Sequence, residues 1–359
     1  MAKASNRDLV SEVKAAIDIV EVVSGYLDLK PAGSGRFKAL CPFHNEKTPS
    51  FHVNRDRQTF HCFGCDKGGD VFTFLEDIEG IDFREVLQNL AERAGIRLDA
   101  YAGPNKEAAR ERTELLKLQS FAARLYRATL VDEVAGRAGR EYVRARGLSD
   151  ETAERFGLGY VAEGWQRLTD AARTEGYRDV ALEGSGLAKR GQRGLYDHFR
   201  NRLMFPIRDV SSKVVAFGGR ALGDDKAKYI NSPESPVYRK SRVLYGLYEA
   251  REALRREKEA IVVEGYFDLL RCVDSGIENV VATCGTALTA EQAGLLKRYV
   301  SSVLVVFDGD EAGKRAALRS VGILVAAGLS VRALAPPEGL DPDDYLGKYG
   351  TEAFRQLAD

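Results

Sequence analysis

Residues 303–310 read VLVVFDGD, an apolar run that ends on two aspartates separated by a glycine. Residues 260–268 read AIVVEGYFD and follow the same plan, with an acid directly after the apolar run. Strand-like segments alternate with helical ones around both stretches. We expect strands at 260–263, 279–283, 303–307 and 331–335, and helices at 266–275, 289–299 and 311–327. This alternation predicts an α/β unit built on a parallel sheet.

Acidic side chains follow three of these predicted strands. Glu264 ends the first, Asp308 and Asp310 follow the third, and residues 341–344 (DPDD) come after the fourth. The carboxyl ends of parallel strands border the ligand crevice of an open sheet, so carboxylates gathered there suit Mg²⁺ or Mn²⁺. Any one aspartate could instead cap a helix, but that alternative explains three strand ends poorly.

Two short cysteine motifs predict one structural zinc ion near the N-terminus. Cys41 and His44 form a C-x-x-H pair, and Cys62 and Cys65 form a C-x-x-C pair. A hairpin of strands at 50–54 and 58–62 would bring the pairs together. Four protein ligands close the coordination sphere and leave no place for a catalytic water. The alternative is free thiols with a chance histidine.

The charge is balanced overall but uneven along the chain. There are 53 Lys and Arg against 53 Asp and Glu, yet residues 186–242 carry 13 basic and five acidic residues. A basic segment beside a carboxylate site indicates a track for a polyanion, whereas ordinary patchiness is the plainer alternative. No apolar run approaches the roughly 20 residues that span a bilayer, and no secretory signal is present, so we expect a cytoplasmic protein without membrane contact.

The composition divides the chain into four parts. Residues 1–100 form the zinc-binding domain, and 101–113, which contain Gly103-Pro104-Asn105, form a linker. Residues 114–242 form the basic subdomain, and 243–359 the metal-binding α/β subdomain. We also expect one helix over 8–27, a helix from Asp70, a helix over 82–94 and one from 114 to about 146.

Taken together, these motifs resemble bacterial DNA primases of the DnaG type. The resemblance rests on the Cys41–His44 and Cys62–Cys65 pairs followed by VEGYFD at 263–268 and FDGD at 307–310. Segments 201–209 (NRLMFPIRD), 228–234 (KYINSPE) and 244–247 (LYGL) also look like that family. The resemblance covers essentially the whole chain. It implies a multi-domain α/β fold: a zinc ribbon, a basic α+β subdomain and a Toprim-type parallel sheet.

The resemblance also implies an activity: Mg²⁺-dependent synthesis of short RNA primers de novo from ribonucleoside triphosphates on a single-stranded DNA template. Glu264, Asp308 and Asp310 match the catalytic acids, with Glu264 as a metal ligand or as general base toward the attacking 3′ hydroxyl. Two or more Mg²⁺ or Mn²⁺ ions are implied. Further residues match the family by position: Asp268, Asp341 and Asp343 in the metal cluster, and Arg146, Arg202, Arg220, Lys228 and Lys240 near template and nucleotide.

Partners and alternatives complete the sequence-based expectations. The family binds the replicative helicase through a C-terminal domain missing here, so we expect the chain to be a fragment, and a second primase chain is a further expected partner. The alternatives are a non-catalytic single-stranded DNA-binding fragment or another Toprim protein, such as a recombination mediator or nuclease. Clustered acids argue against a pure DNA binder, because negative charge repels phosphates.

Overall fold

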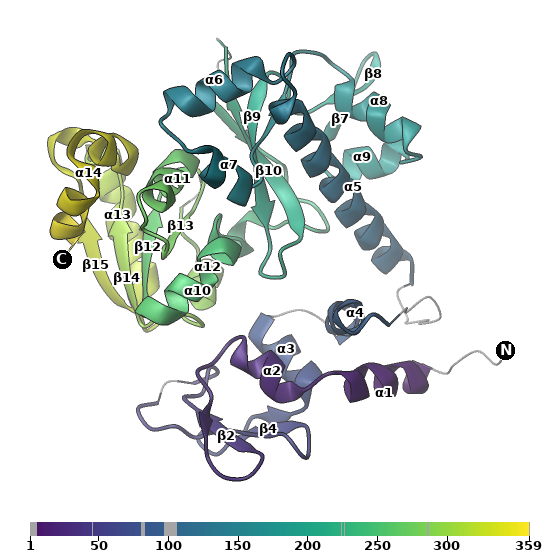
Figure 1. The fold of residues 1–359 in the computed structure, drawn as a ribbon, viewed down its shortest axis with the longest axis vertical. Coiled ribbons are helices and arrows are strands. Elements are labelled where there is room, and N and C mark those ends of the chain that lie inside the picture. The colour runs from purple at the N-terminus through teal and green to yellow at the C-terminus, as the bar shows by residue number, and fades with distance from the viewer. Residues whose placement is uncertain are drawn as a thin grey trace. The chain divides into compact units, whose positions relative to one another are not determined.

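The computed structural model describes residues 6–44, 46–79, 83–96, 106–223, 225, 227–285 and 287–358. The chain forms two compact units, Met1–Lys106 and Glu107–Asp359 (Figure 1). The division falls inside the segment expected to be a linker, whose Gly103-Pro104-Asn105 lies outside the described residues. No helix among the described residues is both long enough and apolar enough to cross a bilayer.

The first unit is a five-stranded antiparallel ribbon covered by helices. Its strands pair in chain order, β1 (Lys30–Pro31), β2 (Arg36–Ala39), β3 (Phe51–Asn54), β4 (Thr59–Cys62) and β5 (Gly68–Gly69). Its helices are α1 (Asn6–Ala16), α2 (Ile19–Ser24), α3 (Val71–Glu79) and α4 (Phe83–Ala94). The single helix expected over 8–27 is wrong: Asp18 caps α2 by accepting a hydrogen bond from Val20 N at 2.9 Å, which breaks the helix there.

Aromatic side chains fill the interior of this unit. Phe51 and Phe60 are 0% and 2% exposed and stack with ring centroids 5.1 Å apart. Phe74 of α3 packs against both rings. These two strand phenylalanines are therefore core residues and not a surface for nucleic acid.

The second unit begins with helices and an antiparallel sheet. Helix α5 (Lys106–Val131) starts eight residues before 114, so residues 106–113 of the expected linker are helical, as their strong helix formers allow. The expected helix to 146 is two helices, α5 and α6 (Arg137–Ala145). They separate at Gly136, where a Cβ would lie 2.1 Å from the Leu130 carbonyl oxygen. The next three helices are α7 (Asp150–Arg155), α8 (Arg167–Thr174) and α9 (Asp179–Gly184).

The antiparallel sheet of this unit has the order β11-β10-β9-β6. Its strands are β6 (Gly159–Val161), β9 (Arg202–Arg208), β10 (Val214–Ala221) and β11 (Tyr229–Asn231), and β7 (Ala188–Gly191) with β8 (Gly194–Asp197) forms a separate hairpin. The apolar runs at 203–207 and 214–217 thus form the two central strands, β9 and β10.

The C-terminal half of this unit is the expected parallel α/β layer. Strands β12 (Glu259–Val263), β13 (Val280–Ala282), β14 (Ser302–Val306) and β15 (Ser330–Leu334) form a parallel sheet in the order β13-β12-β14-β15. The helices are α10 (Leu247–Glu257), α11 (Tyr266–Asp274), α12 (Ala290–Leu296), α13 (Glu311–Ala326) and α14 (Pro342–Ala358). All four strands and three helices expected here are confirmed to within a few residues.

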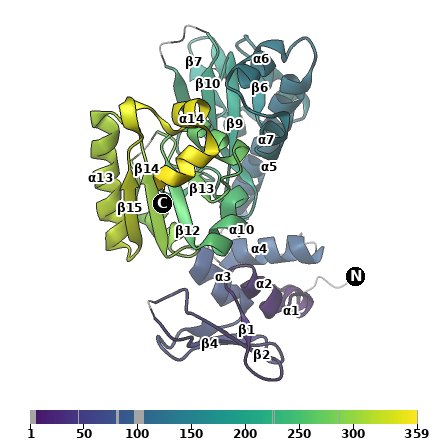
Figure 2. The same cartoon turned by 60° about the vertical axis from the view of Figure 1, so that its left-hand side comes forward.

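Strands β12, β13 and β14 of the parallel sheet are buried on both faces, whereas the edge strand β15 is largely exposed. Ile261 and Val263 point into the cluster that holds α11 and α14, whereas Ala260 and Val262 face the cluster of α10, α12 and α13. Figure 2 shows α13 and α14 on opposite sides of the β14–β15 edge. Burial on both sides explains why these strands read as continuous apolar runs.

Candidate metal and nucleotide sites

The predicted acids lie at one edge of the parallel sheet. β12 and β14 are hydrogen-bonded neighbours running in the same direction, with Val262 opposite Val305, so the residues that follow them emerge together. Glu264 follows β12, and Asp308 and Asp310 follow β14. Asp268 lies in the first turn of α11, and Asp341 directly precedes α14. We call Glu264, Asp268, Asp308, Asp310 and Asp341 the acid rim.

The electrostatics show that members of the acid rim sense one another. Burial and the charge of Asp308 raise the pKa of Glu264, and burial, Asp341 and Asp310 raise the pKa of Asp308. Burial, Asp341 and Asp308 raise the pKa of Asp268 to about 8. Carboxyl groups that share a partly buried site behave in this way.

Several rim acids also cap helices, as the alternative interpretation expected. Gly313 N donates to Asp310 Oδ1 at 2.7 Å, and Gly265 N donates to Asp268 Oδ2 at 2.8 Å. Each contact uses one carboxylate oxygen. Glu264 Oε1, by contrast, is buried and has no hydrogen-bond partner among the described residues. An orphaned buried oxygen on a carboxyl group that senses Asp308 and Asp310 suits a cation such as Mg²⁺, so the cap interpretation is incomplete. Among the described residues, only the four cysteine and histidine side chains of the first unit gather closely enough to form a ready-made ligand set.

Glycine between the rim aspartates allows the chain to pass close to its neighbours. A Cβ on Gly309 would lie 2.5 Å from the Pro336 carbonyl oxygen, and one on Gly313 would lie 2.3 Å from that of Asp308. Gly309 therefore allows the residues before α14 to pack beside the end of β14, and Gly313 allows the tight turn from Asp308 into α13.

Asp343 stands apart from the other predicted metal acids. Its carboxylate, 10% exposed, accepts a short hydrogen bond from Arg146 Nη2, and Arg271 Nε lies 3.7 Å from its Oδ1. The Arg146 guanidinium also lies 4.3 Å from the ring centroid of Phe267. Asp343 is therefore held by two cations at the border of the acid rim.

The raised pKa of Asp268 predicts a pH-dependent response to metal. Its folded pKa of about 8 exceeds the ordinary value of 3.8, so between these values the folded state binds more protons than the unfolded state. Stability of the metal-free protein should therefore fall as pH rises through that window. We expect millimolar Mg²⁺ to raise the unfolding temperature of the second unit more at pH 8.5 than at pH 6, measured by calorimetry. An equal effect at both values would contradict a cation on the rim.

The four predicted zinc ligands converge in the first unit. The ligand atoms of Cys41, His44, Cys62 and Cys65 all lie within 4.8 Å of one another. Cys41 Sγ and Cys65 Sγ are 3.8 Å apart, close to the edge of about 3.8 Å that a tetrahedron with zinc–sulfur bonds of ~2.3 Å requires. The donor set and its geometry therefore fit one tetrahedral zinc ion.

Neighbouring groups prepare these ligands for a metal. His44 Nε2 lies 3.2 Å from Glu46 Oε2. The other ring nitrogen of His44, Nδ1, lies 3.8 Å from Cys62 Sγ and faces the ligand set. Glu46 also accepts from Cys41 N at 2.7 Å. The sequence analysis missed Glu46; an acid two residues after a ligand histidine was the available signal. Hydrogen bonds from Ser50 and backbone N–H groups outweigh burial and lower the pKa of Cys62 to about 7, which favours the thiolate that zinc needs.

The predicted basic residues divide into two groups. Arg202 is 2% exposed and donates to the carbonyl oxygens of Gly219, Ala227 and Lys228 and to Asp225, so it holds the loop after β10. Its role in binding nucleic acid or nucleotide stays a prediction, and its side chain points inward from the sheet. Lys228 is exposed, and Arg220 Nε donates to Tyr142 Oη at 3.0 Å while its guanidinium lies over Tyr229.

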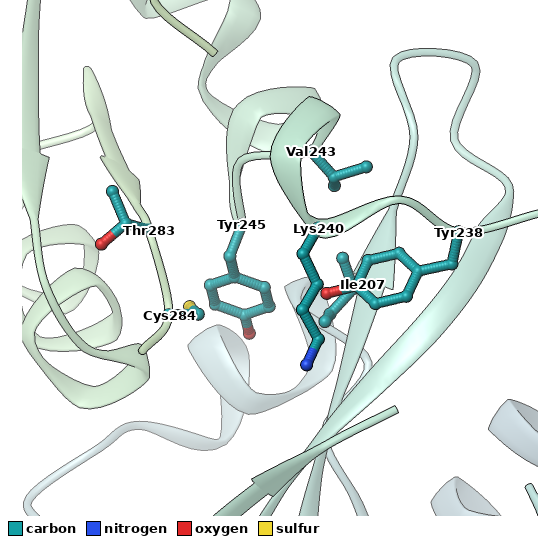
Figure 3. A pocket seen from close by; sticks show the side chains of 7 residues that line it. All are labelled: Ile207, Tyr238, Lys240, Val243, Tyr245, Thr283 and Cys284. Carbon is teal, nitrogen blue, oxygen red and sulfur yellow. The ribbon is translucent and has the colours of Figure 1, made fainter. Parts of the chain in front are cut away.

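Lys240 lies in a small pocket of the second unit (Figure 3). Its ammonium group points the same way as the hydroxyl of Tyr245, which is buried and has no hydrogen-bond partner among the described residues. The pocket is lined by Ile207, Tyr238, Lys240, Val243, Tyr245, Thr283 and Cys284. Cys284 N donates to Glu264 O at 2.9 Å, which connects this pocket to the acid rim.

An exposed aromatic group was missed by the sequence analysis. Trp165, the single tryptophan of the chain, is 65% exposed. The Arg200 guanidinium lies 4.4 Å from its ring centroid, and Tyr196 meets its edge at 5.7 Å. A lone tryptophan in a polar loop was the signal that could have found it.

Comparison with known proteins gives matches along the chain. The models for the CHC2 zinc finger, the DNA primase catalytic core N-terminal domain and a Toprim-like domain match residues 5–106, 125–251 and 261–346. DNA primase of Halalkalibacterium halodurans is 44% identical over 98% of this chain, and that of Geobacillus stearothermophilus 40% over 97%. The chain spans 59% of the length of each of these two relatives.

Solved structures match as well. The Aquifex aeolicus primase, with its zinc-binding and RNA polymerase domains, has a TM-score of 0.65 at 39% identity, covering 98% of this chain and 84% of that one. A DnaG primase catalytic domain bound to single-stranded DNA has a TM-score of 0.65 at 37% identity, covering 69% of this chain and 79% of that one.

Proposed function

Since this chain belongs to the bacterial DNA primase family, we propose that it synthesises short RNA primers de novo on single-stranded DNA. The observation that carries the proposal is the acid rim, where burial and neighbouring acids raise the pKa of Glu264, Asp268 and Asp308 beside the ends of neighbouring parallel strands. Nucleotidyl transfer needs such a site, because divalent cations there neutralise the triphosphate and activate the attacking 3′ hydroxyl.

Each rim residue has a role in this proposal. Glu264, with its orphaned oxygen, would hold Mg²⁺ or Mn²⁺ or accept the proton of the 3′ hydroxyl, and Asp308 and Asp310 would hold the ions that bind the incoming triphosphate. Asp268 and Asp341 would complete the cluster. Asp343 would mainly hold Arg146, with which it forms an ion pair, and would contribute less to metal binding.

The cationic residues around the rim would bind the nucleotide and the template. Arg146 borders the acids through Asp343, Lys240 lines the Cys284 pocket, and both are partly exposed. Arg220 is partly exposed over Tyr229, and Lys228 is exposed. The template strand would stack on Trp165, whose stacked Arg200 supplies a phosphate contact. This use of single-stranded DNA is supported by the DNA-bound relative.

The outer face of the zinc unit offers a second surface for the template. Lys30, Lys38, His52 and His61 are opposite one another in register across β1 to β4, and therefore lie on the same face. Phe63, 73% exposed, packs its ring edge against both histidines. A row of cations and aromatic rings suits a single strand, whose phosphates and bases would meet them in turn.

The proposal extends to partners that the family implies. We propose contact with the replicative helicase through a region of the relatives that this chain does not span, cooperation with a second primase chain, and action at the replication fork in the cytoplasm. Pull-down of the full-length protein with helicase would test the first of these.

Primer synthesis tests the central proposal. The protein, a single-stranded template, ribonucleoside triphosphates and Mg²⁺ should yield labelled oligoribonucleotides, and chelation should abolish them. DNA binding without Mg²⁺-dependent incorporation would instead favour the non-catalytic alternative.

Replacing Trp165 with alanine should weaken binding of single-stranded DNA about tenfold, because stacking on an aromatic ring contributes ~1–3 kcal/mol per base. Fluorescence anisotropy across a salt series would measure it, and the salt slope should stay unchanged. Arg200→Ala should also reduce the magnitude of that slope by about one phosphate contact. Val180→Ala, at a side chain that is 71% exposed on α9, is the matched control. Unchanged affinity in Trp165→Ala would exclude this surface.

A further inference from the structure

Helix α11 contacts both the acid rim and the turn between α6 and α7. It presents Asp268 to the rim in its first turn and Arg271 one turn later. Arg271 Nη1 donates to the Gly147 carbonyl oxygen at 2.6 Å, directly after Arg146. Arg271 Nε lies 3.7 Å from Asp343 Oδ1, so a single guanidinium joins α11, the Arg146 turn and the start of α14.

The Arg146 turn is shaped to receive this guanidinium. Gly147 has a φ of +65°, and a Cβ there would lie 2.6 Å from Arg271 Nη1. Asp274, one turn further along α11, accepts hydrogen bonds from Ser149 N at 3.2 Å and Thr152 Oγ1 at 2.6 Å. The turn is thus fastened to α11 at two points, one on each side of Leu148.

These contacts hold the Arg146 side chain in one position. Its guanidinium lies over Phe267 of α11 and pairs with Asp343 of α14, although its backbone belongs to the helical part of the unit. Asp343 in turn is shared by Arg146 and Arg271. The side chain of Arg271 is only 23% exposed, so its charge acts on Asp343 with limited screening by solvent.

We infer that Arg271 is a positioning residue that fixes Arg146 for the nucleotide and offsets the charge of Asp343 beside the metal-binding acids. The inference rests on the proposed function. Loss of Arg271 should therefore change the binding of nucleotide and of cation in opposite directions. Loss of the contact to Gly147 removes one of the two fastenings of the Arg146 turn and weakens nucleotide binding, whereas loss of the positive charge makes the rim more negative and strengthens cation binding.

The test uses the full chain and two direct binding measurements. Mn²⁺ binding without nucleotide is followed by electron paramagnetic resonance, and binding of a fluorescent ATP at saturating Mn²⁺ by anisotropy. Arg271→Met keeps the aliphatic stem and should raise the nucleotide dissociation constant about three- to tenfold while lowering that of Mn²⁺ about two- to fivefold. Arg271→Lys keeps the charge and should weaken only nucleotide binding, because lysine lacks the planar fork.

Arg155→Met is the matched control. Arg155 Nη1 contacts Glu278 Oε1 at 2.8 Å and links α7 to the segment after α11, but it contacts none of the rim acids. We expect it to leave both dissociation constants unchanged. Unchanged constants in Arg271→Met, weakening of both, or the same changes in Arg155→Met would overturn the inference. A parent protein that binds neither ligand would instead overturn the proposed function, and the inference with it.

Discussion

Replacing Asp308 with asparagine is expected to lower primer synthesis by about three orders of magnitude or more. The substitution removes a charge that would hold the metal ions and thus the stabilisation of the transferred phosphoryl group. The assay is incorporation of labelled ribonucleotide on single-stranded DNA at saturating Mg²⁺.

The same variant should be at least as stable as the parent protein without metal. The pKa of Asp308 is raised by burial and by the charges of Asp341 and Asp310, so a neutral amide relieves repulsion in the folded state. Calorimetry should show an equal or higher unfolding temperature and a smaller response to Mg²⁺. Asp179→Asn is the control and should retain activity, because Asp179 is an exposed acid of α9 that pairs with Arg173 of α8. Full activity of Asp308→Asn would refute the metal role, and its unfolding would reveal a structural role instead.

Removing zinc is expected to unfold the first unit while the second stays folded. Structural zinc contributes up to ~10–16 kcal/mol in small modules, so the loss of even a few kcal/mol should lower the unfolding temperature of this unit by about 20 °C. The Phe51–Phe60–Phe74 core should soften the effect, because it does not depend on the ion.

Cys62→Ser is the corresponding variant, because Cys62 is fully buried among the ligands. It should carry far less than one zinc per chain by elemental analysis, and its first calorimetric transition should move down. His52→Ala removes a histidine of the same sheet that lies outside the ligand set, and should keep one full equivalent. A chelated protein with both transitions unchanged would show that the four residues do not bind a structural metal.

Local sequence patterns predicted the elements that depend on their own residues. The parallel strands and their helices agree with the structure because continuous apolar runs bounded by turns are short-range signals. The zinc ligands could be predicted because two residues between ligands already direct both side chains to one point. The breaks at Asp18 and Gly136 were missed, since each depends on one cap or one close carbonyl contact and not on periodicity.

What the sequence by itself determined is the order of the domains, the zinc ligands and the acids at strand ends, all of which follow from residue type and spacing along the chain. Only the tertiary structure decided that Arg202 is buried, that Asp343 pairs with Arg146 and Arg271, and that Trp165 stacks on Arg200. The physical reason is that these contacts join residues brought together by strand register and helix packing. Burial and charge at such a point depend on every neighbour in space, which spacing along the chain does not specify.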